Sequence, residues 1–335
     1  MSVGTSEWPD SGSDQPRYAP RMRGVVSEWV GGESEYRAAA GVDTRCSEDA
    51  ASWQAMASAD RALATDGWIA EHRLATLDGA PIGHASFRHL PTAVDQDVFV
   101  ARINVVAEHR SSGVGRKLHD VIEAAAWDHG GRRLLGFVGG AEPSGLQFAR
   151  ALGYREVGQS VEAEIDLTQV DIRPVADVPG VTVAALSDLQ ARTDWLDRLY
   201  RLFIAVERDT PFPVDEVPTP FDVFQARSSD AAGARPEAFL IAVDGGEWVG
   251  FTEVRSVEGE PSRWSQELTG VVRSHRGRGI ARFLKQESLR RARRFGVTTV
   301  RTWNDTTNAA ILQINRELGF VPRQTIHQML RTLNG

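Results

Sequence analysis

The sequence predicts two consecutive copies of one α/β domain, and three observations support this prediction. The phrase R-x-x-G-x-G/A occurs twice, at residues 110–115 and 276–281, which are 166 positions apart. Each copy follows an apolar, strand-like run and precedes a stretch with helical periodicity. The same offset also superimposes neighbouring residues, such as Gly153 on Gly319. Shared neighbours at one constant offset indicate an internal duplication.

The first copy is expected to begin with a strand at 24–29 and a short helix at 35–40. Two apolar alternations flank Asp78-Gly79 and predict a hairpin at 67–87, because Asp-Gly is a strong turn signal. A strand at 98–106 leads into the glycine-rich loop. Apolar residues recur at helical spacing from Val114 to Ala125, which predicts a helix at 113–129. A strand at 134–138, a helix at 144–152 and a strand at 154–165 complete the copy.

The second copy repeats this order. Strands are expected at 181–185, 266–272, 297–303 and 320–330, a hairpin at 239–257 around Asp244-Gly245, and helices at 190–206, 279–295 and 308–318. The Pro- and Asp-containing stretch between the copies is typical of a linker. We therefore expect an N-terminal domain at 22–168, a linker at 169–179 and a C-terminal domain at 180–335. Residues 1–21 are rich in Ser, Gly, Pro and Asp and are expected to form a disordered tail.

Composition limits the classes of function. A chain of 335 residues with 41% hydrophobic residues can fill two cores, and its net charge of −7 disfavours nucleic acid and anionic membranes as partners. No apolar run is long enough to span a membrane, and no signal-peptide core is present. The single cysteine, Cys46, excludes an intramolecular disulfide, so we expect a cytoplasmic protein. Eight scattered histidines without paired ligand spacing predict no metal site.

The repeated loop has the chemistry of a phosphate site. Gly277 and Gly279 allow a tight turn in which successive N–H groups converge at the start of a helix. This point carries the positive end of the helix dipole and therefore suits a pyrophosphate. Arg276 and Arg278 can add charge-assisted hydrogen bonds to the same group.

These residues, together with Asn308 and the closing Leu318-Gly319-Phe320, resemble the GNAT N-acetyltransferase superfamily. The resemblance covers nearly all of the chain except the tail and the linker. The run from Thr302 to Asn308, followed by Ile314 to Phe320, is similar to the tandem actinobacterial subgroup that includes mycothiol synthase. The resemblance implies two tandem acyl-CoA N-acyltransferase domains, each with a mixed sheet in which the fourth and fifth strands splay apart.

The resemblance also implies acetyl-CoA as the co-substrate, with its pantetheine arm in the gap and its pyrophosphate on the loop. In the second copy the implied binding residues are Thr269, Gly270 and Val271 on the strand, Arg276, Gly277, Arg278, Gly279, Ile280 and Ala281 in the loop, and Asn304 and Asn308 beside the next helix. In the first copy they are Val105, Arg110, Ser111, Ser112, Gly113, Val114 and Gly115.

The two copies are not equivalent around the implied thioester. Glu267 is matched by Ala101, Asn308 by Glu142 and Asn315 by Ala149. The first copy thus keeps a phosphate loop but lacks these polar side chains. We expect the second copy to be catalytic, and the first to bind cofactor weakly or to serve as a scaffold.

Acetyl transfer to an amine needs a base for the ammonium and an acid for the departing thiolate. Glu267 is the first candidate for the base and Glu253 the second. Many family members have a tyrosine acid where this chain has Asn315, and an amide cannot donate a proton as an acid. Tyr200 is the tyrosine best placed to replace it, and water is the alternative. The N–H of Val271 would meet the oxyanion.

The sequence leaves three functions open. The first is a cytoplasmic acetyltransferase acting on the primary amine of a small molecule. The second uses a longer acyl-CoA or a protein amine, and the third is a non-catalytic scaffold that senses coenzyme A. The acceptor itself is not encoded in any motif. Two fused copies could form a monomeric pseudo-dimer, and a homodimer is equally compatible with the sequence.

Overall fold

The computed structural model describes residues 6–7, 24–47, 50–65, 67–141, 143–172, 177–229, 234–257 and 259–333. The expected disordered tail falls outside these ranges except for β1 (Ser6–Glu7), which pairs with β2 (Gly24–Ser27). Glu142 and residues 173–176 of the expected linker also lie outside the described residues.

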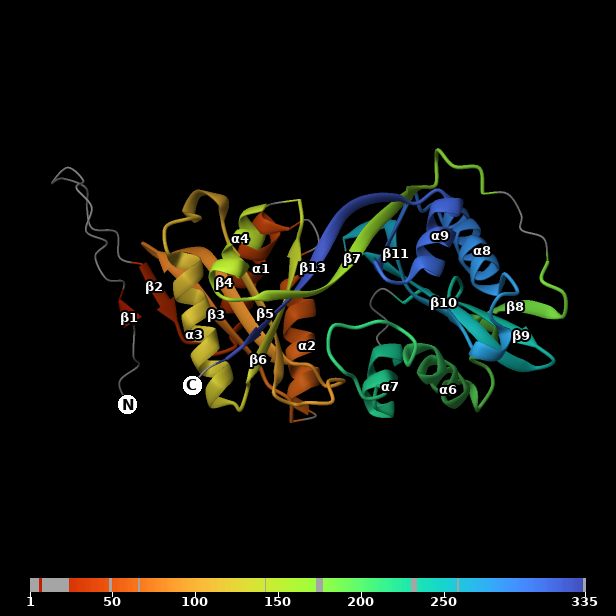
Figure 1. The fold of residues 1–335 in the computed structure, drawn as a ribbon, viewed down its shortest axis with the longest axis horizontal. Helices are drawn as coiled ribbons and strands as arrows, with labels where there is room; N and C mark the ends of the chain where they lie inside the picture. The colour runs from red at the N-terminus through yellow and green to blue at the C-terminus, as the bar shows by residue number, and fades with distance from the viewer. Residues whose placement is uncertain are drawn as a thin grey trace. The chain divides into compact units, whose positions relative to one another are not determined.

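The chain forms two compact units, whose ribbon is drawn in Figure 1. Unit 1 contains residues 1–137, 147–155 and 329–335, and unit 2 contains residues 138–146 and 156–328. The units therefore do not coincide with the two sequence repeats. The last strand of the first repeat lies largely in unit 2, and the end of the last strand of the second repeat lies in unit 1.

Unit 1 contains the glycine-rich loop of the first repeat. Its sheet has the order β1-β2-β3-β4-β5-β6, followed by the end of β13. Its further elements are α1 (Glu33–Cys46), α2 (Trp53–Thr65), β3 (Ala70–Leu77), β4 (Ala80–His89), β5 (Val98–Val105), η1 (Ala107–His109), α3 (Val114–Asp128), β6 (Arg133–Gly139) and most of α4 (Pro143–Ala151).

Unit 2 contains the loop of the second repeat, and its sheet has the order β13-β7-β12-β11-β10-β9-β8. Its elements are β7 (Arg155–Asp166), β8 (Val181–Ala185), α5 (Leu186–Leu189), α6 (Trp195–Glu207), α7 (Phe221–Ser229), β9 (Leu240–Asp244), β10 (Glu247–Val257), β11 (Glu260–Val271), η2 (Arg273–His275), α8 (Ile280–Arg294), β12 (Thr299–Asp305), α9 (Ala309–Leu318) and β13 (Val321–Thr332). Parallel and antiparallel pairs both occur, so the mixed sheet is confirmed.

The exchange of the last strands is visible in the pairing. β7, which ends the first repeat, pairs antiparallel with β12 of the second repeat from Ser160↔Asp305 to Asp166↔Thr299. The end of the second repeat lies in unit 1, where the Leu333 N–H donates to the Arg132 carbonyl at 2.8 Å.

The expected elements are present, with differences at some ends. α1 starts earlier than expected because Glu35 accepts from the Gly32 N–H at 3.0 Å, and it continues to Cys46, beyond the expected end at residue 40. α2 was not expected, since its alanine-rich sequence has few large apolar residues to mark a period. The helix expected at 190–206 begins only at Trp195, after the separate turn α5.

Helices cover both faces of the sheet in unit 2. Figure 1 shows α8 and α9 on one face, which we call the α8 side, and α6 and α7 on the other, the α6 side. The α8 side holds two apolar clusters, one around Val271 and Leu284 and one around Val300 and Phe320. The α6 side holds a cluster around Phe203 and Phe251. Each cluster collects alternate residues of the strands, as a two-residue side-chain period requires.

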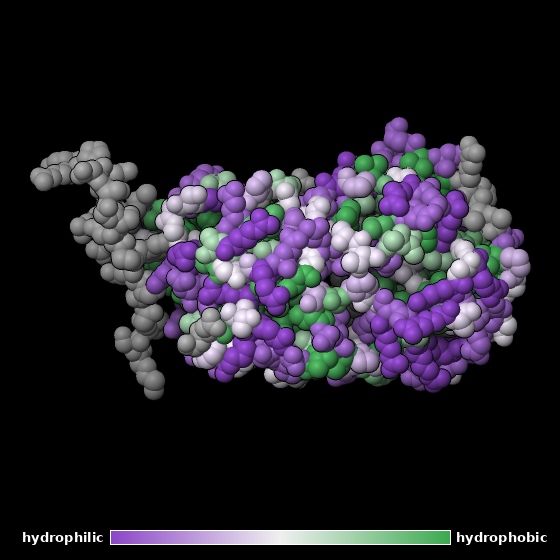
Figure 2. Space-filling view, viewed as in Figure 1, coloured by the Kyte–Doolittle hydropathy of each residue, from purple (hydrophilic) through white to green (hydrophobic). Residues whose placement is uncertain are grey.

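The surface is largely polar. Hydrophilic residues predominate on the face shown in Figure 2, and hydrophobic residues appear there as scattered patches. Of the helices in the described ranges, none combines the length and the apolar character needed to cross a bilayer.

Candidate active site

The sheet of unit 2 opens between β11 and β12. These parallel strands pair only where residues 263–265 face residues 299–301, although both strands continue. We call the unpaired ends, residues 266–271 and 302–305, the C-terminal fork. Its β11 edge has no partner strand within the described chain and can pair with an extended ligand through backbone groups. The splayed strands expected from the family resemblance are therefore present.

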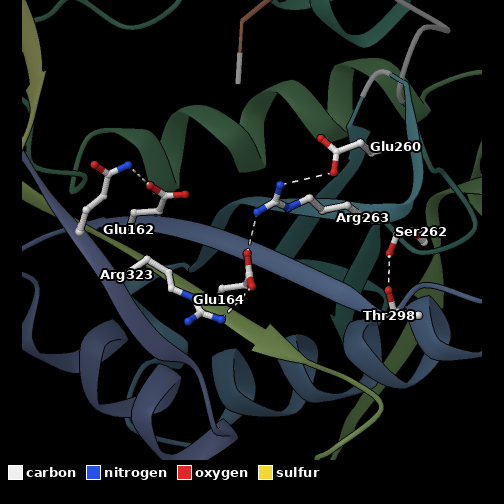
Figure 3. A network of polar contacts seen from close by, with 8 residues as sticks. Glu162, Glu164, Glu260, Ser262, Arg263, Thr298 and Arg323 are labelled. Carbon is white, nitrogen blue, oxygen red and sulfur yellow. Dashed lines mark hydrogen bonds and ion pairs between the residues drawn. The ribbon is translucent and has the colours of Figure 1, made fainter. Parts of the chain in front are cut away.

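A network of ion pairs closes the base of this fork (Figure 3). Arg263 of β11 contacts Glu164 of β7 at 2.8 Å, and Arg323 of β13 contacts the same carboxylate at 3.0 Å. Partial burial alone would raise the pKa of Glu164, but the two guanidiniums outweigh it and lower that pKa. The ionised carboxylate thus joins three strands where the fork begins.

The loop after β11 has the geometry that the sequence predicted. Gly277 and Gly279 adopt positive φ angles of 77° and 83°, and Gly279 is the N-cap of α8. The cap makes no side-chain hydrogen bond, so the first N–H groups of α8 are not capped by Gly279. Ile280 is buried and fixes the helix start against the α8 side. Together these features present backbone donors beside the fork.

The loop arginines shape the loop through protein contacts. Arg276 donates from Nε to the Val271 carbonyl at 3.0 Å and also pairs with Asp209. Arg278 pairs with Asp244 at 2.8 Å. Asp209 also binds Arg273, and the two guanidiniums hold the pKa of Asp209 well below its usual range. The sequence reading missed this anchoring role of Asp209, which lies just after α6.

Buried polar residues line the α8 side of the C-terminal fork. Thr269 and Thr252 share a hydroxyl hydrogen bond of 2.6 Å, and Gln266 donates to Thr252 at 3.1 Å. Asn315 of α9 donates to Asn304 of β12 at 2.6 Å. We call these five residues, with Thr302 and Lys285, the polar band. It separates the two apolar clusters of the α8 side.

Several atoms of the polar band are buried without a hydrogen-bond partner in the described structure. They are Gln266 Oε1, Thr302 Oγ1, Asn315 Oδ1 and Lys285 Nζ. A buried polar atom without a partner is costly, so such atoms mark a place where a polar ligand or water completes the site. An amide-containing arm such as pantetheine fits this set of donors and acceptors.

Asn308 has a structural role at the start of α9. Its Oδ1 accepts from the Ile311 N–H at 3.3 Å, which makes Asn308 the N-cap of α9.

Glycine is required at position 270 by packing, since a Cβ there would lie 2.0 Å from Val206 of α6. Helix α6 therefore packs closely against β11 where that strand forms one edge of the fork.

The two candidate bases lie together on the α6 side. The β10–β11 register shifts between Thr252↔Thr269 and Val254↔Gln266, so Glu253 lies opposite Glu267 and Leu268. This β-bulge places both glutamates on the α6 side of the fork. Glu253 is 7% exposed and lies 3.6 Å from Arg255, while half-buried Glu267 accepts from the Ser265 hydroxyl.

Tyr200 is not brought into this group. Its hydroxyl donates to the Thr219 carbonyl at 2.8 Å, and its ring packs against Phe221 and Phe224. The hydroxyl is thus engaged in holding the segment before α7.

The first repeat has a fork of the same design. β5 and β6 pair only where residues 98–100 face 133–135. Arg110 donates to the Val105 carbonyl at 3.1 Å, as Arg276 does to Val271. Gly113 has φ 91°, and Ser111 occupies the position of Gly277 with φ 60°.

The remaining loop residues of the first repeat are engaged locally. The Ser112 hydroxyl donates to the His109 carbonyl at 2.6 Å. Val114 is buried at the start of α3, and Gly115 approaches Phe148 so closely that a Cβ would lie 3.1 Å from its ring. At the positions of the polar band this repeat has mostly apolar residues or glycine, namely Ala85, Ala101, Ile103, Gly136, Val138 and Ala149, with His119 as the exception.

On its opposite face the first repeat holds a polar chain that the sequence reading missed. The contacts run from Asp43 Oδ1 to His84 Nδ1 (2.8 Å), from His84 Nε2 to His72 Nδ1 (2.9 Å), and from His72 Nε2 to Asp60 Oδ2 (2.8 Å). We call these four residues the histidine relay. Asn104 donates to Asp43 at 2.7 Å, and Tyr36 donates to Asp60 at 2.8 Å.

The contacts of the relay constrain where its protons can lie. If both carboxylates are ionised, each ring nitrogen that faces one carries a proton, and a hydrogen bond between the rings needs one more. This arrangement would place three protons on four ring nitrogens. Trp29 stacks on His72 with centroids 4.6 Å apart.

Comparisons with known proteins agree with this geometry. The profile of the acetyltransferase (GNAT) family matches residues 36–154 and 197–320. A mycothiol acetyltransferase of Streptomyces coelicolor is 24% identical over 254 residues, which cover 76% of this chain and 77% of the relative. One of Amycolatopsis mediterranei is 26% identical over 275 residues, covering 76% and 82%.

Solved structures share the fold over nearly the whole chain. A tandem GNAT protein from the clavulanic acid biosynthesis pathway has a TM-score of 0.72 at 17% identity, covering 93% of this chain and 99% of that protein. A GCN5-related N-acetyltransferase of Sphaerobacter thermophilus has a TM-score of 0.69 at 20% identity, covering 93% and 96%. With the family profile matched twice and both forks in place, the chain belongs to the acetyltransferase (GNAT) family and is a tandem N-acetyltransferase.

Proposed function

We propose that the second repeat transfers the acetyl group of acetyl-CoA to the primary amine of a small molecule. One observation carries this proposal. The C-terminal fork has the polar band on one side and two glutamates on the other, whereas most matching positions of the first repeat are apolar or small. The first repeat keeps the loop and the fork but not the polar groups that the reaction needs.

The binding roles follow from the fork and the loop. Residues 269–271 would hold the pantetheine arm through the unpaired strand edge, and the N–H groups around Gly279 would hold the diphosphate. Orphaned atoms such as Gln266 Oε1 and Asn315 Oδ1 would gain partners from the amides of the arm. Acetyl-CoA supplies the acyl group and a thiol leaving group.

The acceptor amine would approach from the α6 side. There Glu253 or Glu267 takes the ammonium proton, directly or through water, so that the free amine attacks the thioester carbonyl. The Val271 N–H, at the end of β11, stabilises the developing oxyanion. The proton leaves toward solvent from half-buried Glu267.

The acceptor is proposed to be a small amine because acidic residues border the α6 side. From the end of α6 to the first turn of α7, Asp209 is held by arginines and Glu207 accepts from the Thr219 N–H at 3.0 Å. Asp215 and Asp222 are then the candidates to attract a cation. The curated relatives are named for mycothiol. We therefore place the amine that acetylation would convert to mycothiol first among the acceptors to test.

The test is thiol release from acetyl-CoA with a panel of amino-sugar thiols, aminoglycosides, polyamines and peptide N-termini. Gly279→Val and Gly113→Val disturb the matched left-handed positions of the two loops and serve as controls for each other. Loss of turnover with Gly279→Val alone would support the proposal. Loss with Gly113→Val alone would assign catalysis to the first repeat. Saturable coenzyme A binding without thiol release from any acceptor would favour a non-catalytic scaffold.

A further inference from the structure

Lys285 is a buried amine on the helix that follows the phosphate loop. Its side chain is 0% exposed, and Nζ has no hydrogen-bond partner among the described residues. Nζ lies over the ring of Phe320, 5.3 Å from its centroid. Burial lowers the pKa of Lys285 to about 7. An amine in this setting can hold or release a proton near neutral pH.

The neighbours of Lys285 place it between α8 and the end of α9. Leu284, the preceding residue, reaches β10 at Gly250, where a Cβ would lie 3.4 Å from it. Phe320 follows α9, and its N–H donates to the Asn315 carbonyl at 2.9 Å. Lys285 therefore extends from α8 toward α9 on the same side of the sheet as the other partnerless atoms of the polar band.

The duplication gives an independent view of this position. Lys285 corresponds to His119, and Phe320 to Tyr154, by the repeat offset. His119 is also buried, and its Nε2 lies 3.3 Å from the Tyr154 hydroxyl. Both repeats thus place a titratable side chain beside an aromatic ring here. Only in the second repeat does the ring lack a hydroxyl, which leaves the amine available to another partner.

The proposed reaction also needs a proton donor for the thiolate. Asn315 carries an amide, which does not donate a proton as an acid, and the Tyr200 hydroxyl is bonded to the Thr219 carbonyl. We propose, on the basis of the proposed function, that Lys285 is the general acid that protonates the sulfur of coenzyme A as it leaves.

The step balances without a further reactant. The acceptor nitrogen forms a bond to the acetyl carbon, and the carbon–sulfur bond breaks with its electron pair on sulfur. The Lys285 ammonium gives one proton to that sulfur and becomes a neutral amine. The acceptor ammonium gives one proton to the glutamate on the α6 side before the attack, and its nitrogen loses a second proton to solvent as the amide forms. Lys285 regains one proton from solvent before the next turnover.

The decisive experiment compares acetyl-CoA with its selenium analogue, in which selenium replaces the thioester sulfur. A selenolate is a much weaker base than a thiolate, so its departure does not require a proton. We expect Lys285→Met to lower kcat with acetyl-CoA about 100-fold, within the usual range for a general acid, and to lower it little with the selenium analogue. Arg294→Met, at an exposed position in the last turn of α8, is the matched control.

A second measurement does not depend on turnover. Coenzyme A bound to the wild type would lose its thiol proton at lower pH than when bound to Lys285→Met, because a neighbouring ammonium stabilises the thiolate. Thiolate absorbance during a pH titration of each complex reports this difference. Identical titrations of the two complexes would overturn the proposal.

The kinetic outcomes separate the two proposals. Absence of turnover by the wild type would reject the proposed function. The thiol titration would still test whether Lys285 lies close enough to the sulfur of coenzyme A to stabilise its thiolate. An active wild type would reject the acid role of Lys285 in either of two cases. In one, Lys285→Met retains kcat. In the other, it loses kcat equally with sulfur and selenium, as a purely structural role would require.

Discussion

The two repeats share one backbone design but bury their polar residues on different faces of the sheet. In the second repeat, Gln266 and Asn315 lie on the α8 side, where the first has Ala101 and Ala149. On the opposite face, the first repeat has the histidine relay at positions where the second has an apolar cluster around Phe251.

This difference shows what a duplication can change while both copies keep their fold. Gly83 faces Val105 as Gly250 faces Val271, so the strand register is the same here, and it diverges only at the β-bulge beside Glu253 in the second repeat. His84 then corresponds to Phe251. A two-residue side-chain period lets each face vary independently, because substitutions on one face leave the packing of the other intact. The copies can therefore acquire different chemistry without a change of topology.

The largest expected effect is on turnover in the second repeat. Glu253→Gln or Glu267→Gln removes a candidate base, so kcat should fall about 10²- to 10⁴-fold for the residue that takes the proton. Ser86→Ala alters the position that matches Glu253 in the strand pairing, and Ala101→Ser alters the residue that the repeat offset pairs with Glu267. Both variants should leave kcat within about twofold, as expected for residues outside the catalytic centre. Steady-state kinetics of the four variants test the asymmetry, and equal losses in both repeats would contradict it.

The next effect is on stability in the first repeat. Asp43→Ala leaves the charge of the relay without one of its two carboxylates, so the free energy of unfolding should fall by about 3–5 kcal/mol. Val206→Ala is the matched change in the second repeat. Gly270 corresponds to Asn104, and Val206 packs against Gly270 as Asp43 contacts Asn104. It should lower the free energy of unfolding by only about 1–3 kcal/mol. Denaturant unfolding measures both, and a smaller loss for Asp43→Ala would count against a charged relay.

Nuclear magnetic resonance can test the charge of the relay directly. Partial burial tends to raise the pKa of Asp43 and of Asp60, but the bonds from His84 and His72 outweigh it and lower both values. Both carboxylates should then be ionised at neutral pH, with one unprotonated nitrogen among the four of the two rings. ¹⁵N shifts of the imidazoles that show two unprotonated nitrogens would instead mean a neutral pair.

Replacement of Lys285 should have opposite effects on activity and stability. Its folded pKa of about 7 lies below the unfolded value, so the unfolded chain binds more protons between those two values. Burial of the charged ammonium therefore lowers the free energy of unfolding by its full amount below pH 7. This loss of stability disappears once the pH exceeds the pKa of the lysine in the unfolded chain. Lys285→Met should raise the free energy of unfolding by on the order of 3 kcal/mol at pH 6, and by less at pH 10. Unfolding curves at both pH values measure this increase. An increase in the free energy of unfolding that is the same at pH 6 and pH 10 would contradict the prediction.

Much of the fold could be predicted because repeated glycines and apolar periods are local signals. The Asp78-Gly79 turn, the loop at Gly279 and the helices that follow the loops are all found where expected. The exchange of the last strands could not be predicted, since β7 carries the same alternating pattern whichever sheet receives it.

The site was only partly predictable for a similar reason. The loop residues share a motif, but Lys285, Asp43 and Asp209 act through partners far away in the chain. A weak signal existed for two of them, because Lys285 and Asp43 interrupt the buried stripes of α8 and α1 with charge. Such interruptions can equally face solvent, so only the packed structure shows that both are buried.

The smallest effect concerns the backbone of the two loops. Ser111 adopts φ 60° where the second repeat has Gly277 at φ 77°. A side chain costs about 1–2 kcal/mol in this conformation, while glycine loses more entropy on folding, by up to about 1 kcal/mol. Ser111→Gly should therefore raise the free energy of unfolding by about 0.5–1 kcal/mol, and Gly277→Ser should lower it by a similar amount. Because the Gly277 loop is proposed to hold the diphosphate, only Gly277→Ser should also weaken coenzyme A binding in calorimetric titration. Equal weakening by Ser111→Gly would show that the first loop contributes to the affinity as well.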